Sequence, residues 1–493
     1  MQFIQYILPA VAAAVAIPAA GVSLEVQPGT LSSLITDDMR QTETLTLSGS
    51  MDQRDFDALD LLPALRDLDL SGVEIAPYAP KRVKGMMYAR YEAATLPPGA
   101  LLGRHLSALT LPTSLQAIGR GALAGNDFSA ITIPAAVTSI DDDALYGCTS
   151  LESIHIPATV KHMGENVLTG CTALTSAIFE GETLPRGTFS GCTALESVTL
   201  SGAVREIGPD AFAACSSLKA ITLPASLAAI GDKAFVLSGL ETISLPASLK
   251  QVGDYAFALC PALSSASFAS AATLGRGIFY YDTSLEVVDF NDGESTPEQF
   301  PDYLFAGSTR LALPRGLEGA HTIGRYALKD NASATLHLGS TLEHLDDGAM
   351  EGMTSLVTVD ASDLGTSVPS LGKDVFAGIE QPQVTLLVSE TEPVEPWHTA
   401  EQWKEFKIMR VAGIDTPVAP EEEIQAWFSG MMLQVHASQE IKWLQVNDAS
   451  GRILVRIAPG DTDTEIDMSG CDARVYIVTA TTATSATTFK LTR

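Results

Sequence analysis

The residues of this chain that could do chemistry are its six cysteines, its eight histidines and three clusters of acidic residues. A structural zinc site needs cysteines or histidines in closely spaced pairs such as C-x-x-C, and a zinc protease needs H-E-x-x-H. Neither pattern occurs, and the G-x-S-x-G motif of a nucleophilic serine is also absent. The sequence therefore predicts no catalytic residue, no metal site and no cofactor, so we expect a protein that is not an enzyme.

Five of the six cysteines recur at one phase of an internal repeat. Neighbouring coils of a repeat fold come close enough for a disulfide, but side chains stacked in register point in parallel rather than toward each other. Ser238, Asp282 and Ser308 occupy the same phase. We therefore favour free, partly buried thiols over disulfide bridges or a metal ladder. The five residues are Cys148, Cys171, Cys192, Cys215 and Cys260.

The three acidic clusters could bind calcium, because Ca²⁺ prefers carboxylate oxygens. Residues 141–143 and 346–347 stand where other repeats have Gly-Asp-Lys, which favours ordinary turn residues. Residues 461–467 offer four alternating carboxylates but lack the glycine and the distant glutamate of an EF-hand loop. A solvated turn and edge strand is therefore favoured over a calcium site there as well.

The elements that position all these residues are short repeats. Residues 151–164, 218–231 and 240–253 follow the consensus L-x-x-I-x-L-P-x-x-L-x-x-I-G, and a block ending in A-F comes next in the stronger units. Sixteen unit starts can be placed between residues 42 and 381, about 22.6 residues apart on average, which lies inside the range of leucine-rich repeats. One such coil cannot bury its own apolar face, so the units must stack on each other.

The residue types of the consensus explain the shape of one coil. The apolar residues at positions four and six alternate inward along a short strand, and the proline at position seven ends it. The later Leu and Ile-Gly return across the core, where glycine permits a conformation that other residues resist. The predicted fold class is a repeat solenoid: a right-handed leucine-rich repeat coil with one parallel β-sheet of short strands, followed by a small C-terminal antiparallel β-sandwich.

On these motifs the chain resembles the BspA-like, or Treponema-type, leucine-rich repeat family of bacterial surface proteins. The resemblance covers most of residues 42–411 and is strongest between Leu106 and Cys260, where I-x-L-P, I-G and A-F recur in order. The W-x-x-F segment at residues 403–406 resembles the terminal unit of the family, in which a helix closes the last coil. The resemblance implies a non-catalytic adhesin.

The two ends of the chain differ from the repeats. Residues 1–23 carry no charge and are rich in alanine, which predicts a secretory signal peptide; an anchor helix and a mis-assigned start are the alternatives. Residues 24–41 are expected to cap the solenoid, which spans residues 42–411. A polar linker is predicted at residues 412–424, and alternating segments in residues 425–493 predict the β-sandwich. No other segment is long and apolar enough to cross a membrane.

The order of motifs in the last domain resembles the C-terminal sorting domain of the type IX secretion system of Bacteroidetes. The resemblance rests on D-A-S-G-R, a later V-Y-I-V strand and a basic end. It implies that secretion machinery recognises the domain, and that the protein is secreted or held at the outer-membrane surface of a Gram-negative bacterium. The motif residues are Asp448, Gly451, Arg452, Val475 and Tyr476.

The residue at position five of each unit lies between two buried neighbours and must point outward. Small, hydroxyl-bearing residues dominate this row, either because threonine suits exposed strands or because the row is a docking strip for a protein partner. No aromatic row lines the strip, and Tyr280 and Tyr281 are expected to be an isolated pair in a turn, which disfavours sugar binding. The candidate binding residues are Thr110, Thr132, His155, Thr199, Thr222, Ser244, Asp289 and His337.

The charge of the chain limits its partners. The 30 Lys and Arg face 59 Asp and Glu, which gives a net charge of −29. Phosphate backbones and anionic lipid surfaces require clustered cations, so nucleic acid is excluded as a partner. The leading hypothesis is an exported, non-enzymatic protein that binds a host or community surface protein. The alternatives are a carbohydrate-associated accessory or hydrolytic factor and a structural spacer.

Overall fold

The computed structural model divides the chain into two compact units, Met1–Ile221 and Thr222–Arg493. The expected signal peptide up to residue 20, the linker before Ile424 and the motif residue Gly451 lie outside the described residues. None of the helices described is long and apolar enough to cross a membrane. The described residues are 21–79, 91–269, 272–290, 298–311, 317, 319–389, 393–410, 424–429, 431–437, 439–448, 452–471, 475–482 and 486–492.

One coil of the second unit shows how the consensus folds. In β15 (Thr242–Leu245) the second and fourth residues are buried and the first and third are exposed, and a proline follows the strand. The chain then turns and forms a second strand, β16 (Gln251–Val252). Gly253 passes so close to the preceding coil that a Cβ there would lie 2.5 Å from the backbone nitrogen of Asp232. The I-G block is therefore glycine because only glycine fits against the neighbouring backbone.

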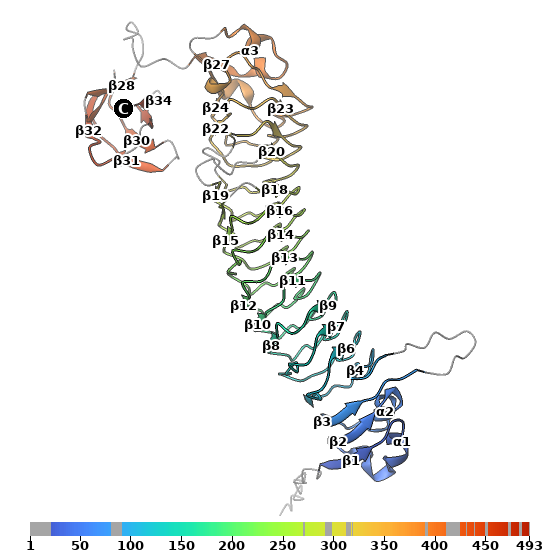
Figure 1. Cartoon of the computed structure of the whole chain (residues 1–493). Coiled ribbons are helices and arrows are strands. Elements are labelled where there is room, and N and C mark those ends of the chain that lie inside the picture. Colours follow the sequence, from blue (N-terminus) through green and yellow to red (C-terminus); the bar gives the residue numbers. More distant parts are fainter. Residues whose placement is uncertain are drawn as a thin grey trace, which may run out of the picture. The chain divides into compact units, whose positions relative to one another are not determined.

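The second series of strands corrects the expectation of a single parallel sheet. Its members have two residues each, too few for a sequence to show strand alternation. They nevertheless pair in register, as β16 does with β18 (Thr273–Leu274). The glycine after them bonds to the preceding coil, since the N–H of Gly253 donates to the carbonyl of Ile230 at 2.8 Å. Each unit therefore carries two parallel sheets, which lie on different sides of its coils (Figure 1).

The first unit begins with its longest strands and its only described helices. The side chain of Asp52 caps α2 by accepting from the N–H of Arg54, and Asp55 completes a capping box. Asp55 also accepts from the N–H of Leu31 at 2.9 Å, which ties α1 to α2. The helical segments are α1 (Leu31–Leu34), η1 (Asp37–Gln41), α2 (Gln53–Ala58) and η2 (Leu59–Leu61).

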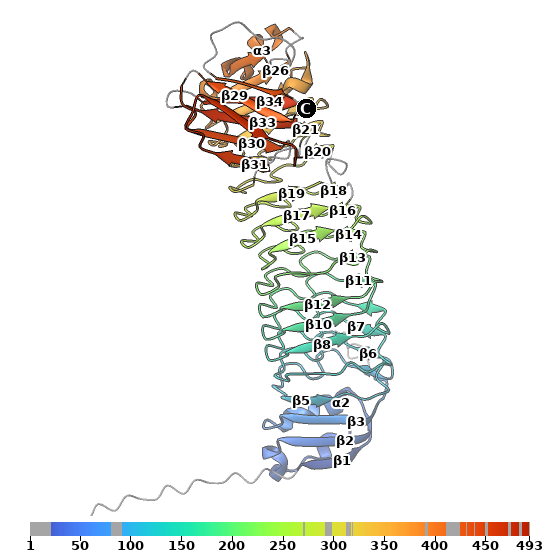
Figure 2. The same ribbon diagram turned by 90° about the vertical axis from the view of Figure 1, so that its left-hand side faces the viewer.

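The strands of the first unit stack as rungs (Figure 2). The first sheet has the order β1-β2-β3-β5 and, further along, β8-β10-β12. The second sheet has the order β4-β6-β7-β9, and β11 pairs with β13. The strands are β1 (Val22–Val26), β2 (Thr44–Met51), β3 (Asp67–Ile75), β4 (Thr95–Leu96), β5 (Ala108–Thr110), β6 (Ala117–Ile118), β7 (Ser139–Ile140), β8 (Ser153–Ile156), β9 (His162–Met163), β10 (Ser176–Phe179), β11 (Thr183–Leu184), β12 (Ser197–Leu200) and β13 (Glu206–Ile207).

The solenoid part of the second unit repeats this arrangement. Its first sheet has the orders β15-β17-β19 and β22-β24-β26-β27, and its second sheet has β14-β16-β18 and β20-β21-β23-β25. The remaining elements are β14 (Ala229–Ile230), β17 (Ser265–Phe268), β19 (Val287–Asp289), β20 (Gln299–Phe300), β21 (Thr322–Ile323), β22 (Thr335–His337), β23 (His344–Leu345), β24 (Thr358–Asp360), η3 (Ser362–Leu364), β25 (Ser370–Leu371), η4 (Gln381–Gln383), β26 (Thr385–Val388), α3 (Glu395–Thr399), η5 (Trp403–Glu405) and β27 (Lys407–Arg410).

Stacked aromatic rings fill the core of these coils. The rings of Phe235 and Phe257, which close A-F blocks, and of Phe279 and Phe305, which take the same position in the next two coils, stack with centroids 5.3 to 5.8 Å apart. Each ring is fully buried, so the phenylalanine of one coil covers the phenylalanine of the next. Stacking between coils therefore supplies the burial that one coil cannot provide.

The last coil of the solenoid is closed by α3 and η5, as the W-x-x-F pattern predicts. Trp397 and Trp403 are buried, and their rings meet edge to face with centroids 5.3 Å apart. Trp403 also packs against Phe376 of the last coil and donates from its indole nitrogen to the carbonyl of Pro369 at 3.0 Å. The large aromatic side chains therefore seal the end of the stack.

The C-terminal residues form two antiparallel sheets that share one apolar core, which confirms the sandwich. Leu433 and Val435 of one sheet face Leu444, Val446 and the ring of Tyr476 of the other. The solenoid followed by this sandwich confirms the predicted fold class, apart from the second series of parallel strands. One sheet has the order β28-β29-β32 and the other β31-β30-β33-β34. The strands are β28 (Ile424–Ser429), β29 (Met432–Ala437), β30 (Trp443–Asp448), β31 (Ile453–Ile457), β32 (Asp463–Asp467), β33 (Val475–Thr481) and β34 (Ala486–Thr492).

Candidate functional site

The outward face of the first sheet in the first unit is built from two rows of side chains. β8, β10 and β12 pair in register, so that His155, Ile178 and Thr199 stand side by side. A parallel row of serines, the first residues of the three strands, accompanies them. Ile178 is 44% exposed, an unusual place for a large aliphatic side chain on an otherwise hydroxyl-rich face. The two rows give hydroxyl groups one coil apart with an apolar contact between them.

His155 marks the edge of this face. Its Nε2 lies 3.3 Å from a carboxylate oxygen of Glu180, whose other oxygen accepts from the N–H of Ala158 at 3.0 Å. Residues 180–182 join β10 to β11 by a shorter link than residues 157–161 make between β8 and β9. Beside this shorter connection lies a hollow of about 900 Å³, whose lining includes Lys161, Glu182 and Arg186. The mixed charges of this hollow can offer both donors and acceptors to a partner that lies on the face.

The corresponding face of the second unit is also hydroxyl-rich. Ser244, Ser267 and Asp289 occupy paired positions on β15, β17 and β19. The Ser267 hydroxyl donates to that of Ser244 at 3.2 Å. Val287, on the same face of β19, is 54% exposed. As in the first unit, exposed hydroxyl groups flank an apolar side chain.

His337 is the least accessible of the predicted face residues, because carboxylates surround it. Its Nδ1 lies 3.2 Å from Asp360 and its Nε2 lies 3.1 Å from Asp363, and its side chain is 16% exposed. The hydrogen bond to Asp360 raises the pKa of His337. Burial opposes ionisation of Asp360, but its bonds with His337 and Ser362 outweigh burial and lower its pKa to about 2. This cluster holds the rung together and leaves His337 little surface for a partner.

The other predicted face residues are exposed, although not all of them lie in strands. Thr110 ends β5 with its side chain outward. Thr132 and Thr222 are exposed but belong to extended segments between strands. Seven of the eight predicted positions therefore point outward and are accessible, and the eighth, His337, is largely covered. The accessible positions are Thr110, Thr132, His155, Thr199, Thr222, Ser244 and Asp289.

The cysteine column is structural. None of the cysteines is disulfide-bonded, as predicted, but the five in the repeat are fully rather than partly buried. Each thiol donates to a backbone carbonyl of the preceding coil; Cys215 bonds to Phe189 and Cys260 to Phe235, both at 3.1 Å. Burial raises the pKa of both thiols to about 12. These groups are therefore neutral thiols that satisfy the coil backbone.

Asp282 occupies the cysteine position of one coil and is the exception in this column. It is fully buried, and its Oδ1 accepts from the N–H of Cys260 at 2.7 Å. Its Oδ2 has no hydrogen-bond partner among the described residues. Burial raises the pKa of Asp282 well above its usual value. The carboxyl group of Asp282 is therefore protonated and neutral, and it occupies the position that a thiol has in other coils.

The acidic turns join one coil to the next. Oδ1 of Asp142 accepts from the N–H of Glu165 at 2.9 Å, and Oδ1 of Asp347 accepts from the N–H of Lys373 at 2.7 Å. In the sandwich, Asp463 accepts from His436 at 2.6 Å at one end of β32. Within the described parts of the chain, no three His, Cys, Asp or Glu side chains are placed to hold a metal ion.

The described motif residues of the last domain form a turn and a strand. Arg452 donates from its backbone and side chain to the carboxylate of Asp448, at 3.0 and 3.1 Å. Asp448 also pairs with Tyr476 across β30 and β33. The ring of Tyr476 is buried in the sandwich core, its hydroxyl donates to the carbonyl of Cys471 at 3.0 Å, and Val475 begins the same strand. These residues have clear structural roles in the sandwich.

One surface was missed by the sequence reasoning. Tyr280 and Tyr281 are not an isolated pair, because Tyr255 and Tyr303 of neighbouring coils contact Tyr280, and Tyr326 contacts Tyr303 in turn. The signal was present in the repeat phase: a tyrosine precedes the A-F or equivalent block in three coils. Comparing each phase of the repeat for aromatic residues would have found it. These five tyrosines lie beside the second sheet rather than on the face predicted for binding.

The repeat region of the chain matches a known protein family. Residues 95–183, 182–312 and 294–391 match the BspA type leucine rich repeat region (6 copies). The matched segments together span more than half of the chain. The chain belongs to this family of leucine-rich repeat proteins.

Solved structures give further likenesses, whereas no match is found among curated proteins. A leucine-rich repeat protein from Bacteroides ovatus is 22% identical, with a TM-score of 0.49, over 74% of this chain and 84% of that chain. A leucine rich cell surface protein from Faecalibacterium prausnitzii is 18% identical, with a TM-score of 0.33, over 66% and 88% of the two chains. The T. pallidum leucine rich repeat protein is 29% identical, with a TM-score of 0.27, over 37% and 75%.

Proposed function

We propose that this protein is an exported, non-catalytic surface protein that binds a protein partner through the outward face of its first-sheet strands. The observation that supports this most is the pair of rows held in register by β8, β10 and β12: a row of three serines beside a row in which Ile178 is exposed between His155 and Thr199. Such a face offers hydrogen bonds at every coil together with an apolar anchor, which is how solenoid surfaces engage extended partners. Membership of the BspA-type family supports the surface location.

Substitutions on the face test the proposal. Thr199→Lys and Thr222→Lys place long cations on it, and we expect each to weaken binding to the best partner in a panel of extracellular-matrix proteins about tenfold. Thr273→Lys is the matched control, because this threonine is exposed on a strand of the second sheet. A control that weakens binding as much, or face variants that leave every interaction intact, contradict the proposal; the second outcome would favour a spacer.

Export is part of the same proposal, and we place its two signals at the two ends of the chain. Val22 and Ser23 pair with Leu45 and Thr46 in the first sheet, so we propose that the signal peptide is cleaved before Val22 rather than after Ser23. We also propose that the last domain directs sorting by a type IX system, as its motif order implies. N-terminal sequencing of exported protein tests the first statement. Retention of a chain that ends at residue 410 inside the cell tests the second, and normal surface display of that chain contradicts it.

A further inference from the structure

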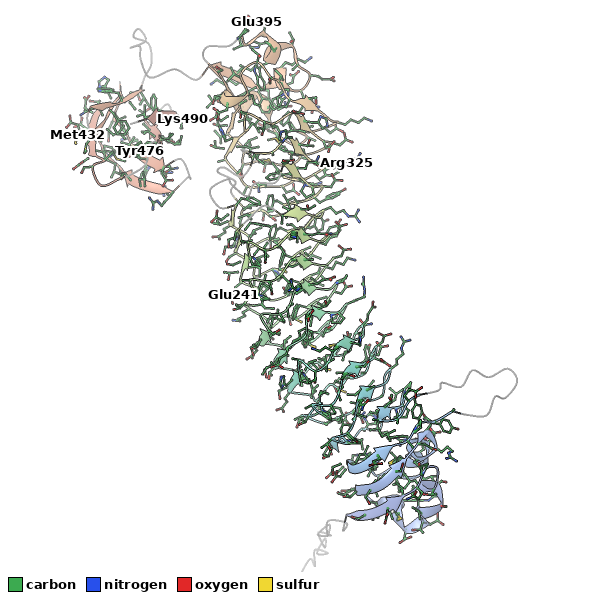
Figure 3. The ribbon with its side chains drawn as sticks, in the orientation of Figure 1. Glu241, Arg325, Glu395, Met432, Tyr476 and Lys490 are labelled. Atoms are coloured by element: carbon green, nitrogen blue, oxygen red, sulfur yellow. The ribbon has the colours of Figure 1, made fainter. Side chains whose placement is uncertain are left out.

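A file of tyrosines runs along one edge of the second unit, beside the second sheet. Tyr255 meets Tyr280, Tyr280 meets Tyr281 and Tyr303, and Tyr303 meets Tyr326, with ring centroids 4.6 to 6.2 Å apart. Tyr281 is 45% exposed and the other four are half-buried. This edge is on the opposite side of the coils from Glu241, which precedes β15; Figure 3 shows Arg325, the neighbour of Tyr326, extending from it. The tyrosine file is therefore separate from the proposed protein-binding face.

The backbone positions of these tyrosines are unusual. In the described coils between residues 95 and 378, two residues near the closing block have positive φ. Most of these positions hold glycine, aspartate or asparagine, such as Asn166 and Gly191, although Ala214, Lys233, Leu237 and Leu259 also occupy them. In the tyrosine file, Tyr255, Tyr281 and Tyr303 have φ values of 56°, 57° and 61°. A left-handed conformation is unfavourable for a residue with a side chain, because its Cβ comes too close to the following carbonyl oxygen. Tyrosine recurs where it is unfavourable for the backbone, and such outliers gather at functional sites.

The rings pack against one another and against the next coil; Tyr280 meets Tyr255 and Tyr303 edge to face, at interplanar angles of 86° and 82°. A Cβ on Gly277 would lie 2.5 Å from the ring of Tyr255, and one on Gly307 would lie 2.8 Å from the ring of Tyr281. The tyrosine of one coil therefore rests on a glycine of the next. No hydrogen bond joins any of the five hydroxyl groups to another protein group in the described residues. The result is a row of supported, partly exposed rings.

Paired charges flank the file. Arg276 lies 5.5 Å from the ring centroid of Tyr255 and 2.9 Å from Asp254. Lys329 lies over the ring of Tyr326 and 2.7 Å from Glu351. Each pair holds one donor group and one acceptor group in place next to a ring. Such pairs suit a ligand that carries many hydroxyl groups and no charge.

We propose that the tyrosine file binds a linear, neutral oligosaccharide that runs along the solenoid. The polarised C–H groups of a pyranose face are attracted to the negative face of an aromatic ring. Coils repeat about every 4.8 Å, which is close to the length of one sugar unit, so successive sugars can meet successive rings. A globular protein partner has no need of such a single file, whereas a linear repeating polymer matches it.

Two variants test the site without disturbing the backbone. Tyr281→Gly and Tyr303→Asn introduce the residues that other coils use at the same left-handed positions, so both variants are expected to fold. The probes are hexasaccharides of β-linked glucose, xylose, mannose and N-acetylglucosamine, measured by isothermal titration calorimetry on the full chain. We expect at least one of them to bind, and each variant to weaken that binding at least tenfold.

The matched control is Lys233→Asn, at the left-handed position of a coil outside the file, and it should leave binding unchanged. Thr222→Lys on the strand face should also have no effect, which separates this inference from the proposed protein binding. The inference is overturned if no hexasaccharide binds, or if binding survives both tyrosine substitutions. The inference is also overturned if the chain binds no sugar and the tyrosine variants lose protein binding instead. That result would assign the tyrosine file to a protein partner.

Discussion

At the scale of single residues, the thiols of the cysteine column are predicted to be unreactive in the folded protein. The five repeat cysteines are fully buried, and burial raises the pKa of Cys148 to about 11. A thiol reagent needs both access and the thiolate. We therefore expect a thiol-specific reagent to label only Cys471, which is partly exposed, in the native chain, and all six cysteines after denaturation. Cys471→Ser should abolish native labelling; fewer than six thiols after denaturation would mean that a disulfide exists.

The buried carboxyl group of Asp282 makes stability depend on pH. Its pKa is raised in the folded state, so the folded chain holds a proton that the unfolded chain releases above about pH 4. Stability is therefore lost as the pH rises past the unfolded value of 3.8 toward the folded one. Asp282→Asn removes this cost, and we expect the free energy of unfolding to rise by about 1 kcal/mol or more at pH 7 and to change little at pH 3.

Chemical denaturation at the two pH values measures this effect. Asp38→Asn, at an exposed position of the first unit, is the control and should change stability at neither pH. A destabilised Asp282→Asn protein at pH 7 would show that the carboxylate is ionised and has a partner in solution.

At the scale of elements, the repeat period of the sequence predicted the longer strands and where they end. The alternation of Ile and Leu around an exposed residue predicted strands such as β8 and β15, and proline marked their ends. It did not predict the second sheet, because a strand of two residues such as β16 has no alternation to detect. Nor did it predict the tyrosine file, since residues such as Tyr255 and Tyr303 become neighbours only through stacking of coils at one phase. The sequence predicted whether a side chain points into the core or outward. Which side chains of neighbouring coils contact each other depends on the geometry of the coils and could not be predicted.

In the terminal unit, the side chain of Gln402 makes backbone hydrogen bonds that the next coil makes elsewhere in the solenoid. Oε1 of Gln402 accepts from the N–H of Val375 at 3.0 Å, and its Nε2 donates to the carbonyl of Gly372 at 2.8 Å. In inner coils such a buried N–H is satisfied by the next coil, as Phe257 is by Ile278. Gln402→Ala leaves these groups without partners, and we expect a loss of about 1–3 kcal/mol in the free energy of unfolding.

Amide hydrogen exchange provides the local measurement for this variant. The amide of Val375 should lose protection in Gln402→Ala, while amides of inner coils keep theirs. Glu401→Ala, at the exposed neighbouring position, is the control and should leave the exchange of Val375 unchanged. Equal protection of Val375 in both variants would mean that another group can satisfy it.

At the scale of the whole molecule, the two kinds of architecture in the chain bury their cores differently. A coil in the solenoid depends on its neighbours, as the stacked rings from Phe235 to Phe305 show. The core of the sandwich consists only of side chains from residues 424–491, with Leu444 and Val446 at its centre. A domain with its own core unfolds as its own cooperative unit. We therefore expect calorimetry of the full chain to show a separate transition for the sandwich.

Two core substitutions assign the transitions, because each removes a fully buried leucine from one architecture only. Leu444→Ala should destabilise the sandwich by about 2–5 kcal/mol and lower the midpoint of one transition, leaving the other in place. Leu336→Ala, in β22 of the solenoid, should do the reverse. If both variants shift the same single transition, the sandwich draws its stability from contacts with the repeats, and the proposed sorting role would then require a chain whose solenoid has already folded.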